Sequence, residues 1–377
     1  MANCDATIQI KRYNHESNSD ACEWYDLYQR ASNSTPFQSR QWGESWLEVY
    51  FPKRQPFRVE ARIGKDLVGL WNLVMTRSPG RVLRPVGFGS SDYLHPLLQD
   101  INSSVYNQMV SSIFEFADHK KCAVDLTRLR ADFIGGPNES ISNSSVGHKV
   151  LVCELPTTFD LYRNRLSKSL RYDLGRLSKR SFRGNDYNLE TVESENIAKG
   201  MEVLFELHWQ RWHSKKLPGS FLWKSREFHL TWATKAASQG SIKIIILKKN
   251  GNPIGAFYGF CDSSTTFYYQ AGMNVQGETI SPGSILIGEA IRQTIEEGGY
   301  RFDFLRGLEP YKYRWKPNYL HELSSIYQPQ PGRFESVGLG LHDFRRRIER
   351  QARSKIESWA YTNEVSVPAL QTIDRTP

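Results

Sequence analysis

The chain has 377 residues, of which 39% are hydrophobic and 24% are charged, and its formal net charge is +9. This is the composition of an ordinary globular protein, so it argues against extensive disorder, and the length suits two domains better than one or four. The five cysteines include no CxxC pair, which argues against a disulfide framework or a zinc module and favours a reducing compartment.

The N-terminal segment and the excess of positive charge bear on location and partners. Residues 1–18 are polar and lack the apolar core of a signal peptide, and no stretch approaches the run of about 20 apolar residues that a membrane helix needs. We therefore expect a cytoplasmic protein. The charge favours an anionic partner, namely a phosphate-bearing cofactor, a nucleic acid or a membrane surface, although an unspecialised basic surface would explain it equally well.

The first half of the chain contains helix, strand and loop signals in a definite order. Two helices are expected first, Trp24–Arg30 and Trp42–Tyr50. A hairpin turn at Gly64-Lys65-Asp66 separates the first two expected strands. The expected strands are 57–63, 67–75, 81–86 and 122–126, with a loop rich in Gly and Ser over 87–102 and a helix over 103–119.

The middle of the chain is strongly basic. Between Arg163 and Arg183 eight cations meet one acidic residue, and leucines recur close to helical spacing. This pattern predicts one basic amphipathic helix within 157–185. It can hold the phosphates of a cofactor, an anionic glycan or RNA, and a solvated helix face explains the same charges without a ligand.

The second half repeats the order of the first. Helices are expected over 201–212 and 224–238, strands over 242–248, 253–261 and 265–272, a helix over 284–297 and a strand over 300–305. Asn250-Gly251 takes the place of the first hairpin turn. Such a repeat implies two copies of one fold, each a mostly antiparallel sheet with a helix crossing over to one more strand.

The domain organisation follows from this repeat. We expect a degenerate N-terminal domain over 1–155, a basic helical connector over 156–195 and an active C-terminal domain over 196–335. The last segment, 336–377, contains a second basic run from Arg345 to Lys355, which predicts a terminal helix, and then a loose tail.

The segment after the third strand of the second half has the chemistry of an anion site. Ser281-Pro282-Gly283-Ser284 is a good helix start, and bare amide N–H groups at such a start can hold a diphosphate. An ordinary helix cap has the same sequence signature.

Other candidates lie nearby. Asp303 sits within an apolar strand, where it can accept a proton from an amine or pair with Arg306 or Lys312, and we expect the orienting role. His208 and Arg211 lie one helical turn apart, and His208 is a candidate general base.

Three groups of residues together resemble a known family. The first is Ser281-Pro282-Gly283, then Phe302–Gly307 with Glu309 and Tyr311-Lys312. The second is Leu207-His208, Arg211-Trp212 and Pro218-Gly219, and the third is Ser91-Asp92-Tyr93. As a set they are similar to the CelD-like acetyltransferases of the GNAT superfamily, a group named for cellulose and exopolysaccharide biosynthesis. They are distantly similar to the FemAB-type peptidyltransferases, which also carry two GNAT-like domains.

The resemblance implies an α+β fold of tandem GNAT-like domains, each a mixed, mostly antiparallel sheet flanked by helices. It implies an acyltransferase that moves an acyl group, in the first place acetyl, from acyl-CoA to an amine or hydroxyl of a sugar or polysaccharide precursor or small molecule, without a metal. The candidate catalytic residues are His208, Asp303, Glu309 and Tyr311, with Tyr311 as the acid that protonates the departing thiolate. The candidate cofactor-binding residues are Tyr269, Gln270, Ser281, Gly283, Ser284 and Arg306, and the candidate substrate-binding residues are Arg171, Arg211, Trp212 and Lys312.

Two alternatives stay open. The diphosphate loop of this family is Gly-rich, whereas the segment 276–284 has only Gly277 and Gly283. A FemAB-like transfer from aminoacyl-tRNA, with the basic helices holding RNA, is the first alternative, and a non-catalytic exopolysaccharide assembly protein is the second. The sequence contains no P-loop, HExxH, GxSxG or kinase signature, which argues against those classes.

Overall fold

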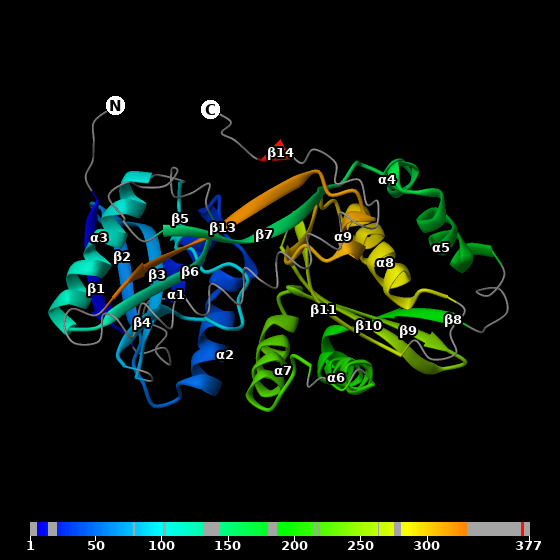
Figure 1. Ribbon diagram of the computed structural model, residues 1–377, viewed down its shortest axis with the longest axis horizontal. Coiled ribbons are helices and arrows are strands. Elements are labelled where there is room, and N and C mark those ends of the chain that lie inside the picture. The colour runs from blue at the N-terminus through cyan, green and yellow to red at the C-terminus, as the bar shows by residue number, and fades with distance from the viewer. Residues whose placement is uncertain are drawn as a thin grey trace. The chain divides into compact units, whose positions relative to one another are not determined.

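The structure is a computed structural model. It describes residues 6–13, 21–77, 80–100, 103–130, 144–179, 187–214, 216, 219–262, 264–274, 280–329 and 371–372. The chain divides into two compact units (Figure 1). Unit 1 contains residues 1–149, 321–364 and 372–377, and unit 2 contains residues 150–320 and 365–371, so that unit 2 interrupts the sequence of unit 1.

Unit 1 is a mixed sheet with helices on its faces. The strand order is β1 (Thr7–Arg12), β2 (Phe57–Ile63), β3 (Asp66–Thr76), β4 (Val82–Pro85), β6 (Ala123–Arg130) and β13 (Tyr319–Gln328), with the short β5 (Leu97–Leu98) beside β3. The helices are α1 (Ala21–Arg30), the 3-10 turn η1 (Pro36–Gln38), α2 (Arg40–Tyr50) and α3 (Ser103–Lys120). Because α3 crosses over between them, β6 pairs parallel to β4 while the other described pairs of this sheet are antiparallel.

Unit 2 repeats this plan. The strand order is β7 (Ser144–Glu154), β12 (Arg301–Arg306), β11 (Thr265–Met273), β10 (Asn252–Cys261), β9 (Ile242–Lys249) and β8 (Tyr187–Thr191). The helices are α4 (Phe159–Arg165), α5 (Lys168–Lys179), the 3-10 turn η3 (Ser194–Asn196), α6 (Ile197–His213), α7 (Lys224–Ala237), α8 (Pro282–Glu296) and α9 (Pro310–Tyr313). A two-residue strand, β14 (Gln371–Thr372), follows near the end of the chain.

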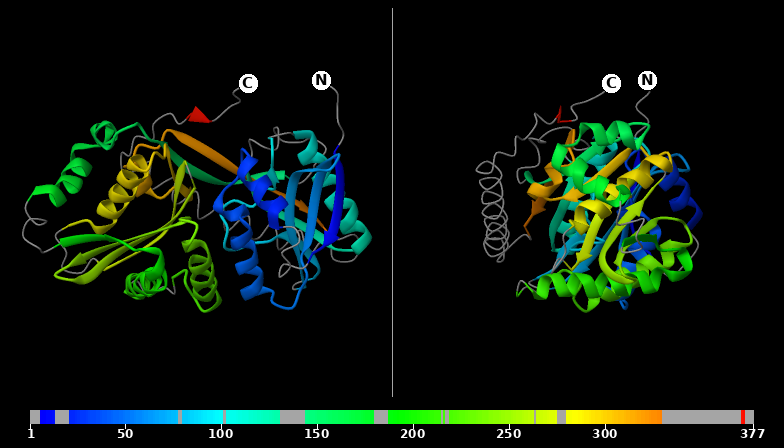
Figure 2. Two further views of the ribbon diagram at one scale, coloured as in Figure 1. Left: turned by 180° about the vertical axis from the view of Figure 1, so that it is seen from behind. Right: turned by 90° about the vertical axis from the view of Figure 1, so that its right-hand side faces the viewer.

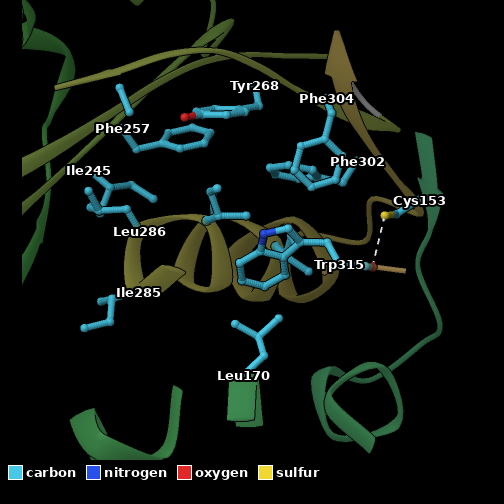
Figure 3. Close-up of a cluster of buried hydrophobic side chains, with 14 of the residues drawn as sticks. Cys153, Leu170, Ile245, Phe257, Tyr268, Ile285, Leu286, Phe302, Phe304 and Trp315 are labelled. Atoms are coloured by element: carbon cyan, nitrogen blue, oxygen red, sulfur yellow. Dashed lines mark hydrogen bonds between the residues drawn. The ribbon is translucent and has the colours of Figure 1, made fainter. Parts of the chain in front are cut away.

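The sheet of unit 2 is covered on both faces. Helices α6 and α7 pack on one face, whereas α8, with α4 and α5 outside it, packs on the other (Figure 2). The core on the α8 side joins the apolar face of the helix to aromatic rings of the strands (Figure 3). Phe257 stacks on Tyr268 with ring centroids 5.3 Å apart, and Phe302 meets Phe304 edge-on at 5.0 Å. Burying each such ring stabilises the unit by roughly 1.5–3 kcal/mol.

Two glycines set how closely helices approach in unit 2. A Cβ on Gly272 of β11 would lie 2.6 Å from the backbone nitrogen of His208, so α6 rests directly on the strand. A Cβ on Gly288 of α8 would lie 2.3 Å from the Leu174 side chain of α5. Only a residue without a side chain permits the contact at Gly272, because a Cβ there meets backbone atoms, whereas at Gly288 the Leu174 side chain would have to move.

The helices and strands expected in the two repeated halves are all present, with ends that shift by a few residues. The expectation of one basic helix within 157–185 is wrong, because the chain breaks at Leu166 and Ser167, whose hydroxyl caps the second helix by accepting from the Leu170 N–H. The basic run from Arg345 to Lys355 lies outside the described residues. Strands β1, β7, β8 and β13 were not expected, and neither were the two-residue strands β5, within the expected loop 87–102, and β14, within the expected tail.

Candidate functional site

The parallel ladder between β11 and β12 opens partway along both strands. Its three pairs are Thr265 with Arg301, Thr266 with Phe302 and Phe267 with Asp303. Both strands continue, to Met273 and Arg306, but these fully described strands form no further pairs with each other. Backbone groups of β11 beyond Phe267 therefore face a gap instead of a neighbouring strand.

A bulge in β12 causes the opening. Its register with β7 shifts between Asp303 and Arg306, and Leu305 has a φ of 54°, a conformation rare for a residue with a side chain. The buried Asp303 carboxylate accepts a hydrogen bond from the Leu305 N–H at 2.6 Å. The position of Asp303 thus favours the orienting role over proton transfer, because its oxygen holds the bulge.

Gln270 occupies the open stretch of β11. Its side-chain oxygen accepts the Ala271 N–H at 3.1 Å, and its nitrogen donates to the Ser220 hydroxyl at 3.3 Å. The Gln270 side chain therefore satisfies the backbone N–H of Ala271, which has no acceptor in β12.

Helix α8 begins beyond this opening. Pro282 is its first residue, and Ser281 makes no side-chain cap to the backbone but lies 3.2 Å from the Ser284 hydroxyl. Within the described part of the chain, the N–H groups of Gly283 and Ser284 have no hydrogen-bond partner. Arg314 brings a cation to this helix end, because its guanidinium donates to Ser284 Oγ at 3.4 Å.

Two tyrosines meet at the opening. The rings of Tyr268 and Tyr311 lie edge-on with their centroids 6.4 Å apart, and each phenol influences the pKa of the other. Burial raises the pKa of Tyr268 to about 12, an effect that the charge of Arg211 reduces. Burial, and then Tyr268 and Glu309, raise the pKa of Tyr311 well above its usual value. Both phenols are protonated at neutral pH, and Tyr311, which is 39% exposed, can donate its proton to a ligand.

His208 projects from α6 into an aromatic cage. Its ring lies 4.8 Å from Phe221 and 5.9 Å from Trp212, and it is only 2% exposed. Its Nε2 has no hydrogen-bond partner among the described residues. Burial, and secondarily the charge of Arg211, lower the pKa of His208 to about 4, so the imidazole is neutral at pH 7 and a weaker base than usual.

Arg211 connects these groups. Its charge acts on His208, Tyr268 and Tyr311, so the three lie within electrostatic reach of one guanidinium. Helix α6, strand β11 and the loop after β12 thus converge on one site.

The loop after β12 is held by a buried lysine. The Lys312 ammonium donates to the carbonyl oxygens of Leu305, Arg306 and Gly307 at 3.3, 2.9 and 3.2 Å, and it pairs with Glu309 at 2.9 Å. The side chain of Lys312 is 4% exposed. These contacts use the whole ammonium, so the structure gives Lys312 a structural role in place of the expected substrate contact.

Comparisons with known proteins identify the fold that carries this site. Residues 168–313 match the family model described as an acetyltransferase (GNAT) domain. Unit 2 has the GNAT fold. A comparison with curated protein sequences found no match.

Solved structures with similar folds cover both units. FemX is similar with a TM-score of 0.60 and 10% identity, over 86% of this chain and 98% of that one. L-PGS from Bacillus licheniformis is similar with a TM-score of 0.54 and 9% identity, over 84% and 94%. A conserved protein of unknown function from Bacteroides thetaiotaomicron has a TM-score of 0.52 and 13% identity, over 85% and 99%. At these identities the likeness concerns the fold, which is a tandem of GNAT-like units.

Some residues expected at the site of the GNAT unit lie apart from it. Strand alternation directs Tyr269 to the face opposite Tyr268, where it packs 4.8 Å from His229 and 4.8 Å from Phe260. Tyr269 therefore lies away from the opening, and Tyr268 lies on the face that meets Tyr311. Arg171 lies on α5, and no contact joins it to the opening within the described residues.

Other expected residues keep a place at the site. Glu309 lies beside Gly307, whose φ is 114° and where a Cβ would come within 2.4 Å of the carboxylate. Arg306 ends β12 and lends its carbonyl to Lys312. Trp212 lines the cage around His208. Gly283 lies near Met273, whose methyl would be 3.1 Å from a Cβ.

Tyr268 and Arg314 were not among the expected site residues. Strand alternation predicts that only one of the adjacent Tyr268 and Tyr269 faces the opening, but it does not decide which one. No sequence signal marked Arg314. Among the described residues, no cluster of His, Cys, Asp or Glu has the arrangement of a metal site, and none of the described helices is long and apolar enough to cross a bilayer.

Proposed function

We propose that the GNAT unit transfers an acyl group from acyl-CoA to an amine or a hydroxyl. The opening between β11 and β12 supports this most directly, because β11 has no ladder partner in β12 beyond Phe267 and the protonated Tyr311 phenol lies beside this stretch. The start of α8 supports it further, since two bare N–H groups suit the diphosphate of coenzyme A, and the Arg314 guanidinium, which also pairs with Asp173 at 3.3 Å, adds a cation there.

In this mechanism the acceptor nitrogen or oxygen attacks the thioester carbonyl directly. A bond from the acceptor to the acyl carbon forms and the carbon–sulfur bond breaks, while N–H groups of β11 stabilise the oxyanion. Tyr311 donates its proton to the departing thiolate, and the acceptor loses one. His208 is the candidate to receive that proton, and its low pKa means that it acts best when a bound ligand supplies the Nε2 partner that the buried ring lacks.

The acceptor class is the finer part of the proposal. The resemblance to CelD-like acetyltransferases favours a sugar or polysaccharide precursor. Unit 1 would then serve as a degenerate half, in which Asp125, the residue that corresponds to Asp303, pairs with Arg84 at 3.1 Å.

A substitution at the α8 start tests donor binding. Ser281→Asp places a good helix cap and a negative charge where the diphosphate would bind, so we expect the helix to stay stable while coenzyme A binding weakens by about tenfold or more. Ser281→Asn has the same shape without the charge and should bind coenzyme A as the parent does. Equal affinities of the two variants in calorimetry would refute the assigned site.

The catalytic step has its own test. Tyr311→Phe should lower the rate of acyl transfer about 100-fold at unchanged coenzyme A affinity, because it removes the proton donor. Tyr300→Phe, also an exposed tyrosine but at the far end of β12, should change neither. Full transfer activity in Tyr311→Phe would exclude this role.

A FemAB-like transfer from aminoacyl-tRNA is the second candidate, favoured by the structural similarity to FemX and by the basic helices α4 and α5. Salt-sensitive binding of tRNA without any stabilisation by coenzyme A would support it. Binding of neither ligand would indicate a non-catalytic protein.

A further inference from the structure

Unit 1 contains a basic cavity of about 1090 Å³, and none of the residues that line it belongs to the acyl-transfer proposal. Among the residues that the structure describes, six cationic residues line it and no acidic residue does. The cations are Arg12, Lys53, Arg54, Arg77, Arg81 and Lys120. We infer that this basic cavity binds a small organic ligand with two or more phosphate groups, of the size of a nucleoside diphosphate.

The fold gathers these cations from separate parts of the chain. They come from the end of β1, the loop between α2 and β2, the end of β3, the start of β4 and the end of α3, all within unit 1 (Figure 1). A solvated helix face would place its charges one turn apart on one element. Cations brought together from five segments around one hollow repel one another, and an anion in the hollow relieves that repulsion.

Most of these cations are not neutralised by the protein. No ion pair or hydrogen bond within the described residues engages the side chains of Lys53, Arg77 or Arg81. Arg54 donates to the Met75 carbonyl at 3.1 Å, which fixes its position and leaves its charge uncompensated. Asp118 lies two residues before Lys120 on α3, and its carboxylate accepts a hydrogen bond from the Gln328 side chain at 2.7 Å.

The rest of the wall suits an organic body. Phe57, Val74 and Met75 also line the cavity, and the Arg12 guanidinium lies 5.5 Å from the centre of the Phe57 ring. A hollow that combines an apolar wall with several cations fits a small molecule better than an extended polyanion, and its volume is near the upper end of small-molecule sites.

The test uses the full chain and ADP as the probe. In calorimetry at low ionic strength we expect ADP to bind one site, adenosine not to bind, and added salt to weaken the affinity. The triple variant Lys53→Gln, Arg77→Gln, Arg81→Gln should lose about tenfold or more in ADP affinity. The control Lys65→Gln, Lys199→Gln, Lys235→Gln loses the same charge at exposed positions outside the cavity and should bind ADP as the parent does.

Three outcomes would overturn the inference: no binding of millimolar ADP, equal losses in both triple variants, or binding of a short RNA that ADP does not displace. The proposed acyl transfer is tested separately by its rate, because the triple cavity variant should transfer acyl groups as the parent does, whereas Tyr311→Phe should lose transfer and keep ADP binding. Retention of cavity-dependent ADP binding in a protein that transfers no acyl group would support the basic cavity and refute the acyltransferase.

Discussion

Replacing Lys312 by Met tests how the loop after β12 is held. The ammonium has four acceptors within 3.3 Å, and the substitution leaves three carbonyl oxygens without a donor while keeping most of the buried stem. Removing one partner of a buried ionic network costs about 3–5 kcal/mol. We expect a loss of roughly 3–4 kcal/mol, or about 6–16 °C in melting temperature for a unit of this size.

The measurement should be local as well as global, because a chain of two units need not unfold in one step. Hydrogen exchange of a peptide covering 301–316 should accelerate in Lys312→Met. Lys316→Met changes a nearby exposed lysine and should leave both readouts within about 0.5 kcal/mol of the parent. Glu309→Gln should also cost less than about 1 kcal/mol, because that carboxylate is 47% exposed. A Lys312→Met protein as stable as the Lys316→Met control would refute the role of the carbonyl contacts.

Three further outcomes are expected. Burial lowers the pKa of His208 from 6.5 to about 4 and that of His229 from 6.5 to about 3, so the unfolded chain binds more protons than the folded one. The free energy of unfolding should therefore fall as the pH drops from 6.5, by about 3 kcal/mol by pH 4 for His208 alone. Urea midpoints that stay constant over this range would contradict this prediction. Because the pKa of His208 is low, its titration should not change kcat/KM between roughly pH 5.5 and 8. A pH-dependent change of kcat/KM in this range that is present in the parent and absent in His208→Gln would contradict this prediction. Gly272→Ala should destabilise unit 2 by about 2 kcal/mol or more, because the methyl meets the α6 backbone. Gly147→Ala, where a Cβ would lie 3.9 Å from its nearest neighbour, provides the comparison for thermal melting.

The element order was predictable because the hydrophobic periodicity of each half is strong. The hairpin turns at Gly64 and Asn250-Gly251 fixed the pairing of β2 with β3 and of β9 with β10. Strand β13 gave no such signal, since it is half-exposed at its start and pairs with β6, nearly 200 residues earlier in the chain. The local sequence pattern of a strand does not reveal a partner strand that lies so far away along the chain.

The sequence predicted several of the residues that meet at the site, but it predicted their individual roles less well. His208, Arg211 and Tyr311 were recognised from the family resemblance, and the structure brings them together. The burial of Lys312 could not be foreseen, because a lysine beside a turn is usually solvated and only the bulge in β12 turns three carbonyl oxygens towards it. The two helices α4 and α5 read as one, because the leucine spacing continues across the break.

The placement of unit 2 within the sequence of unit 1 has a consequence for synthesis on the ribosome. Strand β6 gains its neighbour β13 only after all of residues 150–320 have been made. Until then the nascent first half presents an unpaired strand edge of the kind that recruits other chains. A chain truncated before residue 319 should therefore be insoluble, even though it contains most of unit 2.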